Sequence, residues 1–328
     1  MQFAPPRLAS LADPPLAGRD SAGRNCPRDY AYAPSVFARA PDFAADTLYV
    51  VGGLYGNLEA LAAVERLAAL ERSPPRIVFN GDFHWFDAEP DWFAEIEQGV
   101  APHRALRGNV ETELARGEDV GAGCGCAYPE TVDDGVVRRS NEMLAQLRAG
   151  APIAARDGFR GLPMHLVAQV GHLRVGIVHG DAASLAGWRF ALEALDDAGN
   201  RRWLEAARQA SAIDVFACTH TCAAALRDFA FAAGRLMVIN NGAAGMPNFV
   251  GTRFGVISRI STSASPHQPL YGRMRDGVHI DALAVDYDHD AFLARFLERW
   301  PEASPARESY YKRIVSGPAY TIAQAAPR

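Results

Sequence analysis

Lysine is almost absent from this chain of 328 residues, since Lys312 is the single lysine among 33 basic residues. The formal net charge is −5, which gives no overall attraction to nucleic acid or to acidic membranes. No apolar run approaches the roughly 20 residues that a membrane-spanning helix requires, and no basic-then-apolar signal sequence is found. We therefore expect a cytoplasmic protein that binds neither nucleic acid nor membrane.

The cysteine residues are few, and their number is odd. Five cysteines in a chain without a signal sequence argue against a disulfide framework. Cys124 and Cys126 are separated by one residue, which is closer than the paired ligands of a zinc finger, and no second pair follows at a suitable distance. Their loop, residues 121–129, leaves three interpretations open: a glycine-rich turn, thiols near a functional site, or a redox pair.

The motifs of the common nucleotide-binding folds are also missing. The chain has no Gly-x-x-x-x-Gly-Lys-Ser/Thr sequence, no internal repeat and no heptad pattern. A Rossmann-type fold would need Gly-x-Gly-x-x-Gly after its first strand, and residues 52–56 (Gly-Gly-Leu-Tyr-Gly) do not fit this spacing. These absences exclude P-loop enzymes, dinucleotide-binding domains and repeat proteins.

What the sequence does contain is a β-branched strand, a glycine turn and a helix. Residues 48–51 favour a buried strand, three glycines allow a sharp turn, and Asn57 can cap the helix that follows. Further apolar segments also end in a polar or glycine-bearing turn, and they are residues 77–82, 105–111, 175–181 and 214–220. The chain therefore carries a series of strands that end in chemically useful groups.

Groups that follow the carboxyl ends of strands in an α/β sheet converge on one crevice. We expect this crevice to contain Asp82, Asn109, His179 and His220. A carboxylate, an amide oxygen and two imidazoles suit a divalent first-row transition metal better than Mg²⁺ or Ca²⁺.

In order and spacing, these segments resemble the sequence blocks of the calcineurin-like metallophosphoesterases. Those blocks are Asp-x-His-Gly-Asn, Gly-Asp, Gly-Asn-His/Cys-Asp/Glu, His-Gly and Gly-His-Thr-His. Residues 240–247 (Asn-Asn-Gly-Ala-Ala-Gly-Met-Pro) also resemble a turn of the small bacterial branch. The resemblance covers residues 48–257 and implies a four-layer α/β/β/α sandwich of two mixed sheets.

With this fold, the chain divides into a central domain and two flanking segments. The central domain is expected over residues 47–300, with a loop and helix inserted at 112–160. Residues 1–46 are then an N-terminal arm and residues 301–328 a C-terminal tail.

The blocks depart from the family pattern where metal would bind. Gly53 and Tyr55 stand where the family has its first Asp and His, and Val110 stands where it has His or Cys. The first His of the last block corresponds to Cys218, which as a thiolate would be a soft metal ligand.

The family holds two metals that share one aspartate, and Asp82 matches that aspartate. One metal site would retain Asp82, Asn109 and His179, with Cys218 as a fourth candidate. The other would retain only Asp82 and His220. The resemblance therefore implies one divalent ion, zinc, iron or manganese, or none.

Two functions remain open. The first is a metallophosphoesterase-like hydrolase of impaired or narrowed activity, acting on a small phosphorylated substrate, either a phosphomonoester or a phosphodiester. Asn109 and His220 would then be catalytic, with His220 orienting the phosphate or protonating the leaving group. The second is an inactive protein that uses the fold as a binding or regulatory module.

His84, two residues beyond Asp82, either replaces a lost ligand or is hydrogen-bonded in a packed loop. The oligomeric state is not indicated.

Overall fold

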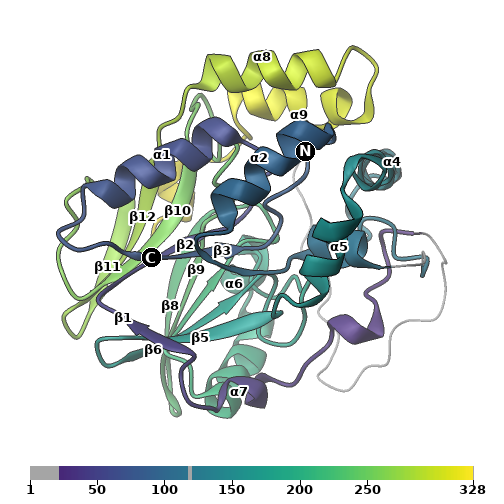
Figure 1. The fold of residues 1–328 in the computed structure, drawn as a ribbon. Coiled ribbons are helices and arrows are strands. Elements are labelled where there is room, and N and C mark those ends of the chain that lie inside the picture. Colours follow the sequence, from purple (N-terminus) through teal and green to yellow (C-terminus); the bar gives the residue numbers. More distant parts are fainter. Residues whose placement is uncertain (1–21, 117–119, 328) are drawn as a thin grey trace.

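The residues that the structure describes form two mixed β-sheets of six strands each at the centre of the molecule. The computed structural model describes residues 22–116 and 120–327. In this part of the chain the sheets stack face to face, and helices cover the outer face of each (Figure 1). The predicted α/β/β/α sandwich is confirmed.

The first sheet is built around the strand of the leading βα unit. Its strands, in spatial order, are β11 (Tyr271–Arg275), β12 (Val278–Val285), β10 (Gly255–Ser261), β2 (Thr47–Val51), β3 (Arg76–Asn80) and β4 (Arg104–Leu106). Strands β2, β3 and β4 run parallel, whereas β10 pairs antiparallel with both β2 and β12. The carboxyl ends of β3 and β4 therefore lie at the same edge.

The central strands of the second sheet are also parallel to one another. In spatial order it contains β1 (Phe43–Ala45), β5 (His165–Val170), β6 (Leu173–Val178), β7 (Val215–Cys218), β9 (Gly234–Asn240) and β8 (Ala225–Phe231). Strands β6, β7 and β9 are parallel, and their flanking partners β5 and β8 are antiparallel to them. The described part of the segment expected to be an N-terminal arm contributes β1, which pairs with β5.

The apolar core follows from the alternation of side chains along each strand. Leu48 and Val50 of β2 face the other sheet and pack in one cluster with Ile177 of β6. Tyr49 and Val51 point to the opposite side and pack against the outer helices. Because both faces of these strands are covered, all five residues of β2 are buried.

The α-helices occupy the outer layers and one end of the sandwich. They are α1 (Leu58–Ala69), α2 (Pro90–Val100), α3 (Asn109–Ala115), α4 (Asp134–Gly150), α5 (Ile153–Arg160), α6 (Leu192–Asp196), α7 (Arg201–Ser211), α8 (His289–Arg299), α9 (Pro305–Ser316) and α10 (Ile322–Ala325). Helices α1, α2 and α8 cover the first sheet, and α7 covers the second (Figure 1). Asn57 caps α1 as expected, since its side chain accepts a hydrogen bond from the Ala60 amide.

The segment expected to be a C-terminal tail forms α9 and α10 over its described residues. Buried Arg227 of β8 pairs with Asp196 and donates to the carbonyl oxygens of Gln324, Ala325 and Ala326. The guanidinium therefore fastens α10 to the edge of the second sheet.

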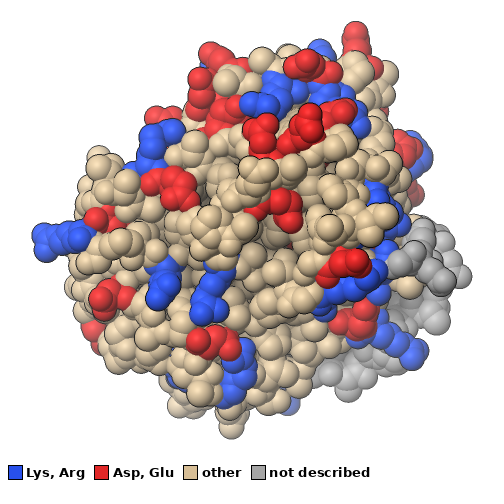
Figure 2. All heavy atoms as spheres, viewed as in Figure 1, with Lys and Arg blue, Asp and Glu red and all other residues tan. Residues whose placement is uncertain are grey.

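Charges on the molecular surface are mixed in sign. On the face that Figure 2 shows, acidic and basic side chains lie beside one another and do not form one large patch of either charge. Among the described residues, no helix has both the length and the apolar character needed to span a membrane.

Candidate functional site

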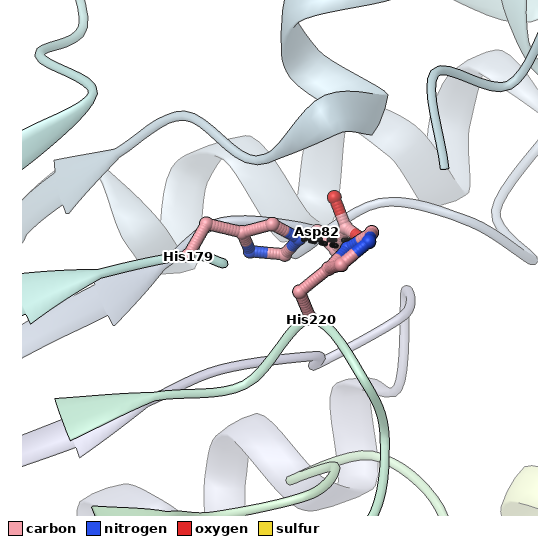
Figure 3. Close-up of side chains that lie close together, drawn as sticks. All are labelled: Asp82, His179 and His220. Atoms are coloured by element: carbon pink, nitrogen blue, oxygen red, sulfur yellow. Dashed lines mark hydrogen bonds and ion pairs between the residues drawn. The ribbon is translucent and has the colours of Figure 1, made fainter. Parts of the chain in front are cut away.

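Asp82, His179 and His220 converge where parallel strands of the two sheets end. Asp82 follows β3, His179 follows β6 directly, and His220 lies just beyond β7. One carboxylate oxygen and one ring nitrogen of each histidine lie within 4.8 Å of one another, and both rings point to the Asp82 side chain (Figure 3). Asn109, the first residue of α3, places its Oδ1 3.1 Å from His179 Nε2. The structure thus brings together four of the five predicted site residues.

Cys218 does not join this group, which corrects the prediction of a fourth ligand. It is the last residue of β7 and packs with Phe216 in the apolar cluster beneath α7, on the outer face of the second sheet. Burial raises the pKa of the Cys218 thiol well above its ordinary value. A neutral thiol in an apolar layer cannot contribute to a metal site on the other side of its strand.

Backbone carbonyls determine which nitrogen of each imidazole faces the centre. His179 Nδ1 lies 2.9 Å from the carbonyl oxygen of Asn80, and His220 Nε2 lies 3.1 Å from that of Cys126. A carbonyl oxygen only accepts, so these two nitrogens donate, and the remaining nitrogen of each neutral ring is an acceptor. His179 Nε2 and His220 Nδ1 are 3.2 Å apart, and Asp82 Oδ2 is 3.3 Å from His179 Nε2.

In the absence of a metal, the positive charge at this centre comes from a proton. Burial alone would lower the pKa of His179, but the Asp82 carboxylate outweighs burial and raises this pKa above its ordinary value. Burial, followed by the nearby His179, lowers the pKa of His220 to about 3. The His220 ring is therefore neutral, and below the raised pKa of His179 a proton resides on that ring beside the carboxylate.

The loop that contains Cys124 and Cys126 orients two of these side chains. Asn109 Nδ2 donates to the Cys124 carbonyl oxygen at 2.9 Å, which turns Oδ1 toward His179. The carbonyl of Cys126 holds the His220 ring, and the two cysteine sulfurs lie 2.7 Å apart. This position agrees with the interpretation of thiols near a functional site; sequence reasoning did not identify the two carbonyl contacts.

Gly125 lets the loop approach closely, and a side chain there should loosen it. Its φ is +69°, and an added Cβ would lie 2.3 Å from the Tyr30 hydroxyl oxygen and 3.2 Å from Asn109 Cβ. We expect Gly125→Ala to shift both carbonyls and to weaken metal binding about 10–100-fold, as loss of outer-shell partners commonly does. Titration of the chelator-treated protein with Zn²⁺ or Mn²⁺ measures the change.

Gly121→Ala is the matched control, because Gly121 has φ of +77° in the same loop and a Cβ there meets no described atom within 4 Å. Equal metal affinity in both variants would contradict a clamping role for the loop.

Glu111 organises the turn that presents Asp82. Its carboxylate accepts hydrogen bonds from the backbone amides of Asp82 at 2.8 Å, Phe83 at 3.1 Å and Gly108 at 2.8 Å. Asp82 has φ of +51°, a left-handed conformation that these bonds help to maintain. Burial raises the pKa of Glu111 to about 7.

His84 points away from the candidate metal ligands. Its ring nitrogens contact Asp87 and Glu97, and the ring stacks on Phe93 at a centroid distance of 3.7 Å. Burial would lower the pKa of His84, but the two carboxylates raise it to about 9. His84 is thus a charged residue of a packed loop and does not replace a lost ligand.

The Tyr55 ring fills the space beside Gly53. A Cβ on Gly53 would lie 2.8 Å from Cε2 of the Tyr55 ring, and the Tyr55 hydroxyl contacts Cys222 Sγ at 2.7 Å. A side chain at position 53 would therefore meet the phenol ring of Tyr55.

A pocket of about 190 Å³ opens onto these groups. Its wall is largely aromatic, formed by Tyr55, Trp85, Tyr128, Trp188 and Tyr310. Its polar lining includes Asp82, Asn109 and His220 together with Arg313 of α9. Sequence reasoning missed Arg313, because it lies in the segment expected to be a tail.

Solved structures share this architecture at low sequence identity. A hypothetical protein from Pyrococcus horikoshii OT3 is 18% identical, with a TM-score of 0.57, over 84% of this chain and 99% of that one. A metallophosphoesterase from Sphaerobacter thermophilus is 17% identical, with a TM-score of 0.52, over 84% of this chain and all of that one. No family model matches the sequence, and no curated protein matches it significantly. The resemblance predicted from the sequence is confirmed at the level of the fold.

Proposed function

We propose that this metallophosphoesterase-like chain is a hydrolase of phosphoesters that binds one divalent metal through Asp82, Asn109, His179 and His220. The observation that carries the proposal is the meeting of four acceptor atoms. They are Asp82 Oδ2, Asn109 Oδ1, His179 Nε2 and His220 Nδ1. Once His179 has lost its proton, both imidazoles are neutral and no hydrogen atom lies between these acceptors, so they repel one another unless a cation lies among them.

The donor set fits a transition metal. In both histidines the outward nitrogen donates to a backbone carbonyl, which is how metal-binding imidazoles are usually oriented. Two nitrogens, a carboxylate and an amide oxygen favour zinc, iron or manganese over magnesium or calcium. The phenol ring beside Gly53 leaves no carboxylate there for a second ion, which supports one metal.

The chain's own residues divide the work of the reaction. A bound divalent ion would supply Lewis acidity, which lowers the pKa of water and neutralises charge on phosphoryl oxygens. A pKa near 3 leaves His220 without a proton to give at neutral pH, so it is suited to bind the metal and not to protonate a leaving group. The aromatic wall favours a substrate whose alcohol part is flat and apolar.

Metal analysis combined with two substrates tests the proposal. Phenyl phosphate and bis(4-nitrophenyl) phosphate represent the two ester classes. We expect one metal per chain and slow turnover of at least one ester, lost on chelation and restored by Zn²⁺, Fe²⁺ or Mn²⁺. Turnover that survives chelation would refute the proposal. Stoichiometric metal binding without turnover of either ester would favour the binding or regulatory module.

Metal affinity should depend on pH through His179. A proton must leave His179 Nε2 before a metal binds, and Asp82 raises the pKa of this ring above 6.5. We therefore expect affinity to be constant at high pH and to fall about tenfold per pH unit below that raised pKa. Competition with a metal-binding dye between about pH 5 and 9 measures this, and a profile that is flat down to the ordinary histidine pKa would contradict it.

A further inference from the structure

The pocket contains a single permanent positive charge. Among the described residues that line it, Arg313 is the only arginine or lysine, and Asp82 is the only carboxylate. We propose that Arg313 binds the phosphate group of the substrate and supplies the positive charge that a second metal ion would provide in a two-metal site. This inference rests on the proposed phosphoesterase function and extends it to a residue outside the metal centre.

The guanidinium of Arg313 is held in place before any ligand arrives. Nε donates to the carbonyl oxygen of Pro247 at 3.1 Å, and Nη2 donates to that of Cys222 at 2.9 Å. These bonds use two of the five N–H groups, so the remainder can face the pocket. The helix that carries it is anchored by buried Ile314, whose carbonyl oxygen lies 2.7 Å from His289 Nε2. A planar cation fixed in this way suits an oxyanion with little further ordering.

Arg313 lies beside the position at which the chain departs from the family pattern. Cys222 connects the two features, because its carbonyl oxygen accepts from Arg313 and its Sγ contacts the Tyr55 hydroxyl. The Tyr55 ring in turn fills the space next to Gly53. Where the family pattern has an aspartate and a histidine, this chain has a glycine and Tyr55. Through Cys222, the Tyr55 phenol is connected to the Arg313 guanidinium. A phosphate in this pocket would lie in a space lined both by the candidate ligands Asp82, Asn109 and His220 and by Arg313.

Arg313 could instead serve only to brace α9 against the segments around residues 222 and 247. The two roles differ in how they respond to lysine. A lysine retains the charge but cannot reproduce both carbonyl bonds, whereas a glutamine loses the charge. If the charge of Arg313 binds phosphate, the lysine and glutamine variants should differ in phosphate affinity. If Arg313 only braces α9, the two variants should lose the same affinity.

Calorimetric titration with inorganic phosphate tests the proposal on chelator-treated and metal-loaded protein. We expect Arg313→Gln to weaken phosphate binding about 10–100-fold in both states, as loss of a charge-assisted contact does, with Arg313→Lys falling between it and the wild type. Arg307→Gln is the matched control, since Arg307 lies on the same helix over the Tyr311 ring and does not line the pocket. Phenyl phosphate as substrate should show a matching rise in KM in Arg313→Gln.

Two results would overturn the inference. One is wild-type phosphate affinity in Arg313→Gln, and the other is an equal loss in the lysine and glutamine variants accompanied by equal falls in Tm. Failure of the proposed function is a separate outcome, because phosphate binding by chelated protein needs neither metal nor turnover. Arg313-dependent binding without hydrolysis would refute the phosphoesterase and leave the anion site.

Discussion

Asp82→Asn is expected to abolish tight metal binding and to leave the metal-free protein folded. Asp82 Oδ1 accepts from the Val110 amide at 3.1 Å, and an asparagine oxygen can retain this bond. The new amide group could then donate to His179 Nε2, which lies 3.3 Å from the present Oδ2 and loses its proton more readily once the carboxylate no longer raises its pKa. Asparagine also tolerates the left-handed φ of +51° at this position.

Loss of a charged ligand should lower metal affinity more than about 100-fold, beyond the range for outer-shell changes. Thermal unfolding with and without added metal provides the measurement, because a metal that binds only the native state raises Tm by mass action. Asp276→Asn is the matched control, since Asp276 has the same φ of +51° on the exposed turn between β11 and β12. Equal metal-dependent stabilisation of Asp82→Asn and the wild type would contradict the proposed ligand set.

Gly53→Asp should be destabilising alone and tolerated together with Tyr55→His. The new Cβ would lie 2.8 Å from the Tyr55 ring, and the φ of +63° adds strain, so the single change should cost about 1–3 kcal/mol. A histidine in place of Tyr55 removes the bulk and adds a third imidazole to those of His179 and His220. We expect the double variant to bind two metals and to hydrolyse phosphoesters about 10²–10⁴-fold faster, the range typical of one well-placed catalytic group.

Metal content and turnover of the double variant decide this prediction. Gly53→Asp combined with Tyr55→Phe is the control, because phenylalanine retains the ring and should leave the overlap in place. A double variant with one metal and unchanged turnover would show that the departures at Gly53 and Tyr55 do not limit activity. Stable folding of the single variant would show that the Tyr55 ring can move aside.

The grouping of Asp82, His179 and His220 was predictable because it depends on local signals. Each follows an apolar segment, and parallel pairing places the ends of such segments at one edge of a sheet. Which face a side chain takes is harder to predict. All four residues of β7 are buried and apolar, so no polar alternation marked Cys218 as sharing the outer face with Phe216.

Other features depend on contacts between distant segments. The carbonyl oxygens of Cys124 and Cys126 contact Asn109 and His220, which lie 15 and 94 residues away in the sequence. Strands β1, β8 and β11 were not anticipated; in β8 a buried arginine, Arg227, interrupts the apolar pattern, and its partners lie in α6 and in the segment around α10. No periodic pattern in the sequence predicts these contacts between distant segments.

The order of strands in the first sheet has a consequence for biosynthesis. Leu48 of β2 pairs with Ile260 of β10. The central strand β2 is therefore synthesised long before its partner strand β10. When His220 has left the ribosome, all four proposed ligands exist, yet the sheet that positions Asp82 still lacks β10 and β12. Pairings between strands that are distant in the sequence form slowly. We therefore expect that the four proposed metal ligands are not yet brought together while the chain is being synthesised. Metal would then load onto the finished, released protein and would not guide the folding of its first half.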